Sequence, residues 1–332
     1  MAATGTGLPR LGLTWVTWRQ HRAAVFGLLG LLAVYAAALL IHGLHTHANF
    51  DRLGLNQCRS FATGRCEQLS HTFLDDNYHL LQVVMMFLLV LPAAFGAFLG
   101  GPLVARELET GTYRFAWTQG VSRTRWAATK IALIGAALAA VTAAYGPLYM
   151  WWAGPQRQIM TPSFNDYLGF EFSGFLFPVH TLLAFALGVL AGLVLRRTIP
   201  AIAVSFGTAF GLLLAAVFVL RRFYMTPLAT TAPVGSRDWV VGTTYLDPSG
   251  HALPDGGHAL FLRFVAQLPD PTSDVPSGAF RQWLEARHYK ILYHYQPGGR
   301  LWDFQLIETA WMGGLALACL AVALWLLRQR TD

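Results

Sequence analysis

Residues 174–195 read GFLFPVHTLLAFALGVLAGLVL, and residues 199–220 read IPAIAVSFGTAFGLLLAAVFVL. Only Arg196, Arg197 and Thr198 separate these two apolar stretches, and His180 is the one ionisable residue within either. Because about 20 apolar helical residues cross about 30 Å of hydrocarbon, each stretch predicts a transmembrane helix. The pair therefore predicts a tight helical hairpin in a membrane.

The rest of the chain extends this pattern. Of its 332 residues 55% are hydrophobic and 12% are charged, whereas a soluble globular chain is about a quarter charged. Four further segments are long and apolar enough to span, at approximately residues 23–42, 80–104, 127–152 and 306–327. The composition excludes an ordinary soluble domain and predicts an all-α polytopic membrane protein with six transmembrane helices.

Basic residues predict the orientation of these helices. Twelve of them fall on the side that holds both chain termini, and only four fall on the two short loops opposite. Since positive residues accumulate in short cytoplasmic loops, both termini are expected in the cytoplasm. Arg221 and Arg222 conflict with this assignment, because they lie at the outer end of the fifth span.

The predicted spans divide the chain into three parts. Residues 1–220 hold the first five spans, residues 221–305 form the longest loop, and residues 306–332 hold the last span and a cytoplasmic tail. The long loop contains two segments typical of strands, at 238–246 and 290–295, and an apolar helical stripe of Phe280, Trp283 and Leu284. We expect a small extracytoplasmic α+β unit there.

The amino-terminal stretch precedes the first span and is basic. Leu11, Trp15 and Trp18 would share one face of a helix. This pattern predicts an amphipathic helix lying on the membrane, and the alternative is a frayed tail with two interfacial tryptophans.

Two cysteines, Cys58 and Cys66, fall in the first outward loop. An oxidising exterior favours a disulfide between them, and two free thiols are the alternative. Cys319 lies in the last span, where we expect a small core residue.

Ionisable residues are scarce in the predicted spans. His180 and Glu308 are the intramembrane polar residues that stand out, and such residues are functional hypotheses by default. Both are shallow enough to reach interfacial water, which is the alternative. The scarcity favours an apolar or amphipathic substrate over an ion relay.

Three histidines lie at or beyond the end of the first span, and three glycine pairs lie within the spans. His42, His45 and His47 do not share a helix face well, so no metal site is expected. Three glycine pairs have the spacing that lets helices approach closely, either within the chain or at a dimer seam; they are Gly96/Gly100, Gly188/Gly192 and Gly207/Gly211.

Enzymatic motifs are missing from the sequence. Lys130 and Lys290 are each followed by Ile, so neither belongs to the Gly-Lys-Ser/Thr loop of a P-loop ATPase. No catalytic constellation is visible either, and the chain is expected to be no enzyme and to bind no cofactor itself.

The most informative stretch lies between the second and third spans, where residues 105–126 read ARELETGTYRFAWTQGVSRTRW. Gly111 would end one helix and Ser122 would cap the next. Aromatic and charged side chains would be exposed in between, which fits either a site for a soluble partner or an ordinary basic connector at the headgroups.

This stretch resembles the ABC-2 type transporter permease family. Residues 106–112 (RELETGT) followed by 121–123 (VSR) carry the resemblance, and residues 115–126 and 295–308 resemble its actinobacterial branch. The family often has Pro before the Val-Ser-Arg segment, where this chain has Gly120.

The resemblance implies a mechanism and partners. Such a permease pairs with a second permease, here expected to be an identical copy, and with cytoplasmic ABC ATPase subunits that bind ATP and Mg²⁺, in a bacterial plasma membrane and without nucleic acid. The segment between spans two and three would be the coupling helix. The residues expected to contact the ATPase are Glu107, Glu109, Gly111, Tyr113, Arg114, Arg123 and Arg125.

We therefore expect the permease subunit of an ATP-driven exporter of an apolar or amphipathic substrate. The alternative is a polytopic sensor or resistance protein that uses the 221–305 unit without an ATPase. A membrane-embedded enzyme ranks third.

Overall fold

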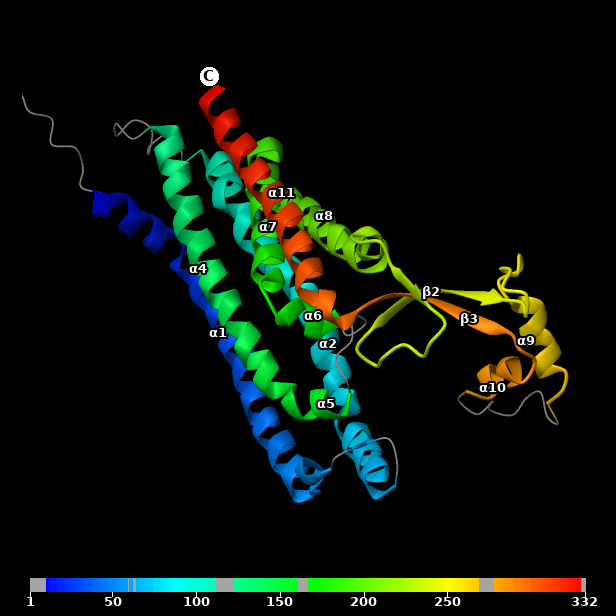
Figure 1. Cartoon of the computed structure of the whole chain (residues 1–332). Helices are drawn as coiled ribbons and strands as arrows, with labels where there is room; N and C mark the ends of the chain where they lie inside the picture. Colours follow the sequence, from blue (N-terminus) through cyan, green and yellow to red (C-terminus); the bar gives the residue numbers. More distant parts are fainter. Residues whose placement is uncertain are drawn as a thin grey trace, which may run out of the picture. The chain divides into compact units, whose positions relative to one another are not determined.

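The computed structural model describes residues 10–58, 60–61, 64–111, 122–160, 167–268 and 278–329 (Figure 1). Two compact units emerge within these residues. The membrane unit contains the described residues up to Met160, those from Tyr167 to Arg221, and those from Gln305 onward. The second unit contains the described residues from Arg222 to Phe304.

Long helices dominate the membrane unit. Their bounds are α1 Arg10–Arg52, α2 Arg65–Thr110, α4 Arg123–Trp152, α7 Leu176–Leu195, α8 Thr198–Phe218 and α11 Leu301–Gln329. Short elements join them: η1 Leu55–Gln57, α5 Gly154–Ile159, α6 Tyr167–Phe172 and η2 Leu220–Phe223. The chain is mostly helical, as its composition predicts.

Among the described residues, six helices are long and apolar enough to cross a membrane. The spanning segments are Gly30–Arg52, Met86–Thr110, Arg123–Trp152, Leu176–Leu195, Thr198–Phe218 and Gly298–Gln329. The prediction of six transmembrane helices is therefore confirmed in number and in helical character, and the chain is a multi-pass membrane protein.

The first two helices extend far past the expected membrane segments. α1 has 43 residues and α2 has 46, so each is roughly 65–70 Å long at 1.5 Å per residue. The sequence predicts a loop over 43–79, but most of it is helix. Hydropathy locates the membrane and says nothing of where a helix stops, and here Phe50, Leu55 and Phe73 give the extension an apolar core of its own.

The amino-terminal residues belong to the same helix as the first span. α1 begins at Arg10 and has no break before Arg52, and Figure 1 shows its first turns, in dark blue, inclined to the remainder. The expected surface helix is thus continuous with the spanning helix.

Glycines bring α2 and α7 into backbone contact. A Cβ on Gly100 would lie 2.2 Å from the Phe185 carbonyl oxygen, and one on Gly188 would lie 2.6 Å from the Gly101 nitrogen. Two of the predicted glycine pairs, Gly96/Gly100 and Gly188/Gly192, therefore serve packing within the chain. Nothing lies within 4 Å of a Cβ built on Gly207 or Gly211 of α8.

The second unit is a small α+β structure. A three-stranded antiparallel sheet has the order β1-β3-β2, from β1 Leu228–Thr230, β2 Trp239–Leu246 and β3 Lys290–Gln296. The short helices α9 His258–Val265 and α10 Ala279–Glu285 follow β2, and η3 Gly298–Arg300 follows β3. β2 and β3 occupy the two segments that the sequence predicts as strands.

Aromatic rings and a cap order the second unit. Phe280 packs against Phe264 and Trp283 at centroid distances of 5.2 and 6.1 Å. The Asp255 carboxylate accepts the backbone N–H groups of Ala259, at 2.8 Å, and Gly257. The bond from Ala259 in particular holds the pKa of Asp255 below its ordinary value.

Candidate coupling elbow and buried ion cluster

The elbow, defined as the end of α2, residues 112–121 and the start of α4, is bounded by two well-formed helix ends. Gly111 follows the last residue of α2 with φ +72°, a left-handed conformation that glycine adopts at helix ends. The Ser122 hydroxyl accepts the Arg125 N–H at 3.3 Å and caps α4. Tyr113 and Arg114, expected to contact an ATPase, lie outside the described residues.

Glu107 forms an ion pair inside the chain. Its carboxylate contacts the ammonium group of Lys130 in α4, whose side chain is only 1% exposed. The same ammonium lies 4.5 Å from the ring centroid of Trp126. Because a buried charge is costly unless it is paired, Glu107 compensates Lys130. The sequence counts Lys130 among the basic residues that lie between or flank the second and third spans, and the structure places it within α4 with its side chain buried.

Glu109 caps a different helix. Its Oε2 accepts the backbone N–H of Thr198 at 3.0 Å and the Thr198 hydroxyl at 2.8 Å. Thr198 is the first residue of α8, and Arg197 before it provides no side-chain cap. A carboxylate at this place satisfies an otherwise unpaired N–H and matches the positive end of the helix dipole.

Arg123 and Arg125 begin α4. The Arg125 side chain is exposed and Arg123 is half-buried. Cations in the first turn of a helix face the positive end of its dipole, which disfavours them slightly. Helix stability therefore does not explain these two arginines.

A second polar group, the ion cluster, contains Glu171, His180, Arg221 and Glu308, all of them buried. Arg221 donates from Nε and Nη2 to the two oxygens of Glu308, each at 2.8 Å. This two-point geometry is the strong form of an arginine–carboxylate pair. The guanidinium also lies 4.0 Å from the Phe170 ring centroid.

His180 joins the other acid to this pair. Its Nδ1 lies 2.5 Å from Glu171 Oε1, and its Nε2 lies 3.4 Å from Glu308 Oε1. A protonated imidazole would bridge two carboxylates, and with Arg221 it would balance their charge. The cluster thereby ties α6, α7, η2 and α11 together.

Three members of the cluster have donor atoms suitable for a metal. Those of Glu171, His180 and Glu308 lie within 4.8 Å of one another. However, both Glu308 oxygens already accept from a permanent cation, which would repel a divalent ion. The arrangement fits a charge-balanced ion network better than a metal centre.

Sequence reasoning found only half of this cluster. It singled out His180 and Glu308 as separate shallow residues, left Arg221 as an exception to the charge rule, and did not single out Glu171. The available signal was opposite charge at one end of neighbouring spans, since such charges must pair when both are buried.

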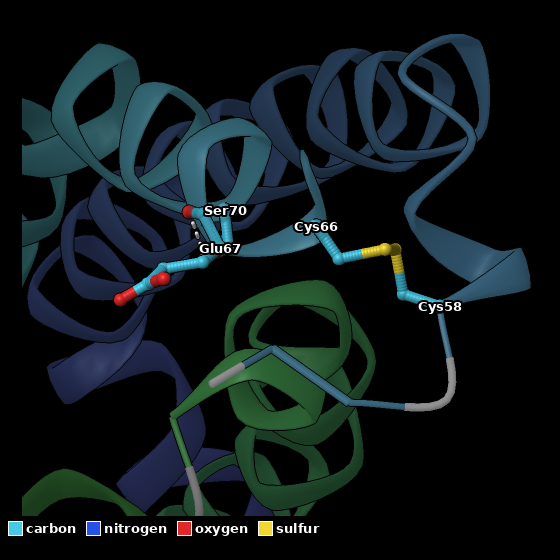
Figure 2. The surroundings of a disulfide bond; sticks show 4 residues. All are labelled: Cys58, Cys66, Glu67 and Ser70. Atoms are coloured by element: carbon cyan, nitrogen blue, oxygen red, sulfur yellow. Dashed lines mark hydrogen bonds between the residues drawn. A yellow bond between two sulfur atoms is a disulfide. The ribbon is translucent and has the colours of Figure 1, made fainter. Parts of the chain in front are cut away.

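Cys58 and Cys66 are joined by a disulfide across the turn between α1 and α2 (Figure 2). Cys58 follows η1 and Cys66 is the second residue of α2. In the next turn of α2 the Ser70 hydroxyl donates to the Glu67 carbonyl at 2.7 Å. The bond closes the tip of the α1–α2 helical hairpin.

The histidines of α1 contact α4. His42 Nδ1 accepts the indole N–H of Trp152 at 2.9 Å. His47 Nε2 lies 2.9 Å from the Trp151 carbonyl oxygen and donates to it in the matching tautomer. These two side chains therefore join helices, which accounts for them without a metal.

The fold and site define a multi-pass helical membrane protein in which Gly111 ends the helix of the second span and Ser122 caps the helix of the third. A family model described as ABC-2 membrane transporter related matches residues 29–221. The chain belongs to this ABC-2 transporter-related family, which suggests a permease subunit. The match ends at Arg221 of the ion cluster. No curated protein and no solved structure matches the chain.

Proposed function

We propose that this chain is the transmembrane permease subunit of an ABC exporter, driven by ATP hydrolysis in a separate ATPase. The observation that carries the proposal is the elbow. It connects two spanning helices, both of its ends are capped, and Arg125 is exposed beside it within the matched region. The chain itself has no P-loop lysine, so the energy source must be a partner.

The disulfide supports one orientation of the chain in the membrane. Disulfides persist outside the cytoplasm, so the Cys58–Cys66 tip supports an outward-facing α1–α2 turn. Six spans then leave both termini and the elbow in the cytoplasm, and the second unit on the outer side. In this orientation the elbow lies in the cytoplasm, where an ATPase can contact it.

The substrate proposed is apolar or amphipathic. A cleft of about 380 Å³ runs between α4, α7 and α11, with Gly135, Phe185 and Ala316 among its lining residues. A second, of about 360 Å³, lies between α1 and α2 beside Tyr35 and Phe95. Both linings are almost wholly apolar, which suits an acyl chain or a similar apolar group.

A second copy of this chain is the proposed permease partner. The Gly207/Gly211 face of α8 leaves open the space that a packed helix would occupy. Close approach at small residues is a common basis of helix association in membranes.

The experiment is recovery of partners from native membranes solubilised in mild detergent. The native chain is expected to recover an ABC ATPase. Arg125→Glu should lower that recovery at least tenfold by reversing charge at the elbow, whereas Arg328→Glu, an exposed charge reversal in α11, should not. If no ATPase were recovered with the native chain, the exporter proposal would be refuted.

The competing function is a sensor without an ATPase. It is favoured by the separate core of the second unit and by a cleft of about 190 Å³ there, lined in part by Arg281, Tyr289 and Lys290. The same recovery experiment separates the two functions.

A further inference from the structure

Two acids at the end of α2 point to different helices. Glu107 and Glu109 are two residues apart, so they lie about 200° apart around the helix axis at roughly 100° per residue. Glu107 contacts Lys130 of α4, and Glu109 binds Thr198 of α8. The end of α2 is thus held on two sides.

The link to α8 is a helix cap supplied by another helix. The Glu109 carboxylate takes both the first N–H of α8 and the adjoining hydroxyl. Any displacement of the last turn of α2 must either carry the start of α8 with it or break these bonds.

The link to α4 is the ion pair between Glu107 and the buried Lys130. The Lys130 side chain is fixed by its burial, and the Glu107 side chain is 12% exposed. Separating them would leave the Lys130 charge buried without its carboxylate, which is unfavourable. α2 and α4 are therefore constrained to move together beside the elbow.

The packing of α2 against α7 allows these two links to transmit movement. α2 and α7 pack through glycine backbones along their length, and close packing transmits displacement. The two acidic links add α4 and α8 to this block at the elbow end.

We propose that Glu107 and Glu109 are positioning residues that transmit movement of the last turn of α2 to α4 and α8, instead of binding the ATPase directly. This inference rests on the proposed function, because an ATPase must move the elbow. It assigns each acid a separate helix, so each link is separable by experiment.

The test is hydrogen–deuterium exchange of the permease–ATPase complex, without nucleotide and after trapping with ATP and orthovanadate. In the native complex, trapping should change exchange at the first turns of both α4 and α8. Glu109→Ala, which removes the oxygen that accepts both bonds from Thr198, should remove at least half of the trapping-dependent difference at α8 and leave that at α4.

The reciprocal variant is Glu107→Gln combined with Lys130→Met, which avoids an unpaired buried ammonium. It should remove the difference at α4 and leave that at α8, so each variant controls for the other. Thr198→Val, which removes only the hydroxyl donor, should weaken the α8 response, and Thr198→Ser should restore it.

Three results would overturn the inference. Glu109→Ala could lose the ATPase while the native chain keeps it, which would make Glu109 a partner contact. Exchange at α8 could rise equally in both states with the difference intact, which would make the cap merely structural. Either variant could abolish both responses together, which would remove the separate assignments. Absence of ATPase from the native chain would instead refute the proposed function.

Discussion

Two polar junctions among the described residues, one near each end of α7, differ in burial. The ion cluster joins His180, near the start of α7, to the buried residues Glu171, Arg221 and Glu308, whereas Thr198 just beyond the end of α7 binds the exposed acid Glu109. Both junctions use acids paired with donors from other helices. The buried ion cluster holds its helices in fixed positions. The exposed Glu109–Thr198 bonds can break when a partner moves one of the two helices.

The largest expected effect comes from removing one partner of an ion pair in the buried ion cluster. Arg221→Ala leaves the Glu308 carboxylate buried without its main partner, which should cost about 3–5 kcal/mol of folding free energy. Thermal unfolding of the purified chain would show this as a large fall in the midpoint, with Arg328→Ala as the matched exposed control.

A double variant tests whether the lost stability comes from the unpaired Glu308 carboxylate. Arg221→Met combined with Glu308→Leu removes both charges and should be more stable than Arg221→Ala alone. If the single and double variants lost equal stability, the ion pair would not be what matters at this junction.

The next effect concerns which junction faces outward. α2 and α7 run in the same direction, with Gly96 near Thr181 and Gly192 near Ala105, so the disulfide tip lies on the ion-cluster side of the elbow. Cys66→Ser should destabilise the hairpin tip by about 2–3 kcal/mol, given a closed loop of about nine residues.

Thiol labelling of intact cells checks the side directly. Cys58 and Cys66 should resist a thiol reagent until a reductant that does not cross membranes is added. Labelling of both thiols without any reductant would contradict an oxidising location for the tip.

The smallest effect tests the Glu107–Lys130 ion pair, which lies at the same end of α2 as Glu109. Glu107→Gln removes the carboxylate that pairs with the buried Lys130 ammonium and should cost about 1–3 kcal/mol of folding free energy. Lys130→Met leaves an acid close to the helix end that can turn toward water, and should cost less than about 1 kcal/mol. Unfolding midpoints of the two variants, measured side by side, would reverse order if Lys130 were the more accessible partner.

Sequence reasoning reached the helical class and the six spans, because span length and hydropathy follow from bilayer thickness. It also placed Gly111 and Ser122 at helix ends from local chemistry. It did not foresee that α1 and α2 continue as a hairpin, since helix does not require apolar residues. Nor did it pair Glu107 with Lys130 or Arg221 with Glu308, because those contacts join residues 23 and 87 positions apart.

The partners of Glu107 and Glu109 within the chain were unforeseen for a related reason. Glu107 and Glu109 look like surface charges in the sequence, because they follow an apolar span. In the structure both bind within the chain, which only packing of α4 and α8 around α2 can reveal. Arg125 keeps the exposure expected of a partner contact.

The most direct test of the account is photocrosslinking in native membranes from single introduced sites. A photoreactive residue at position 125, in the elbow, should form an adduct with an ABC ATPase. The same residue at position 56, in the α1–α2 turn, should form none. An ATPase adduct from position 56, or none from position 125 with the chain correctly inserted, would contradict the claim that the elbow is where this permease meets its ATPase.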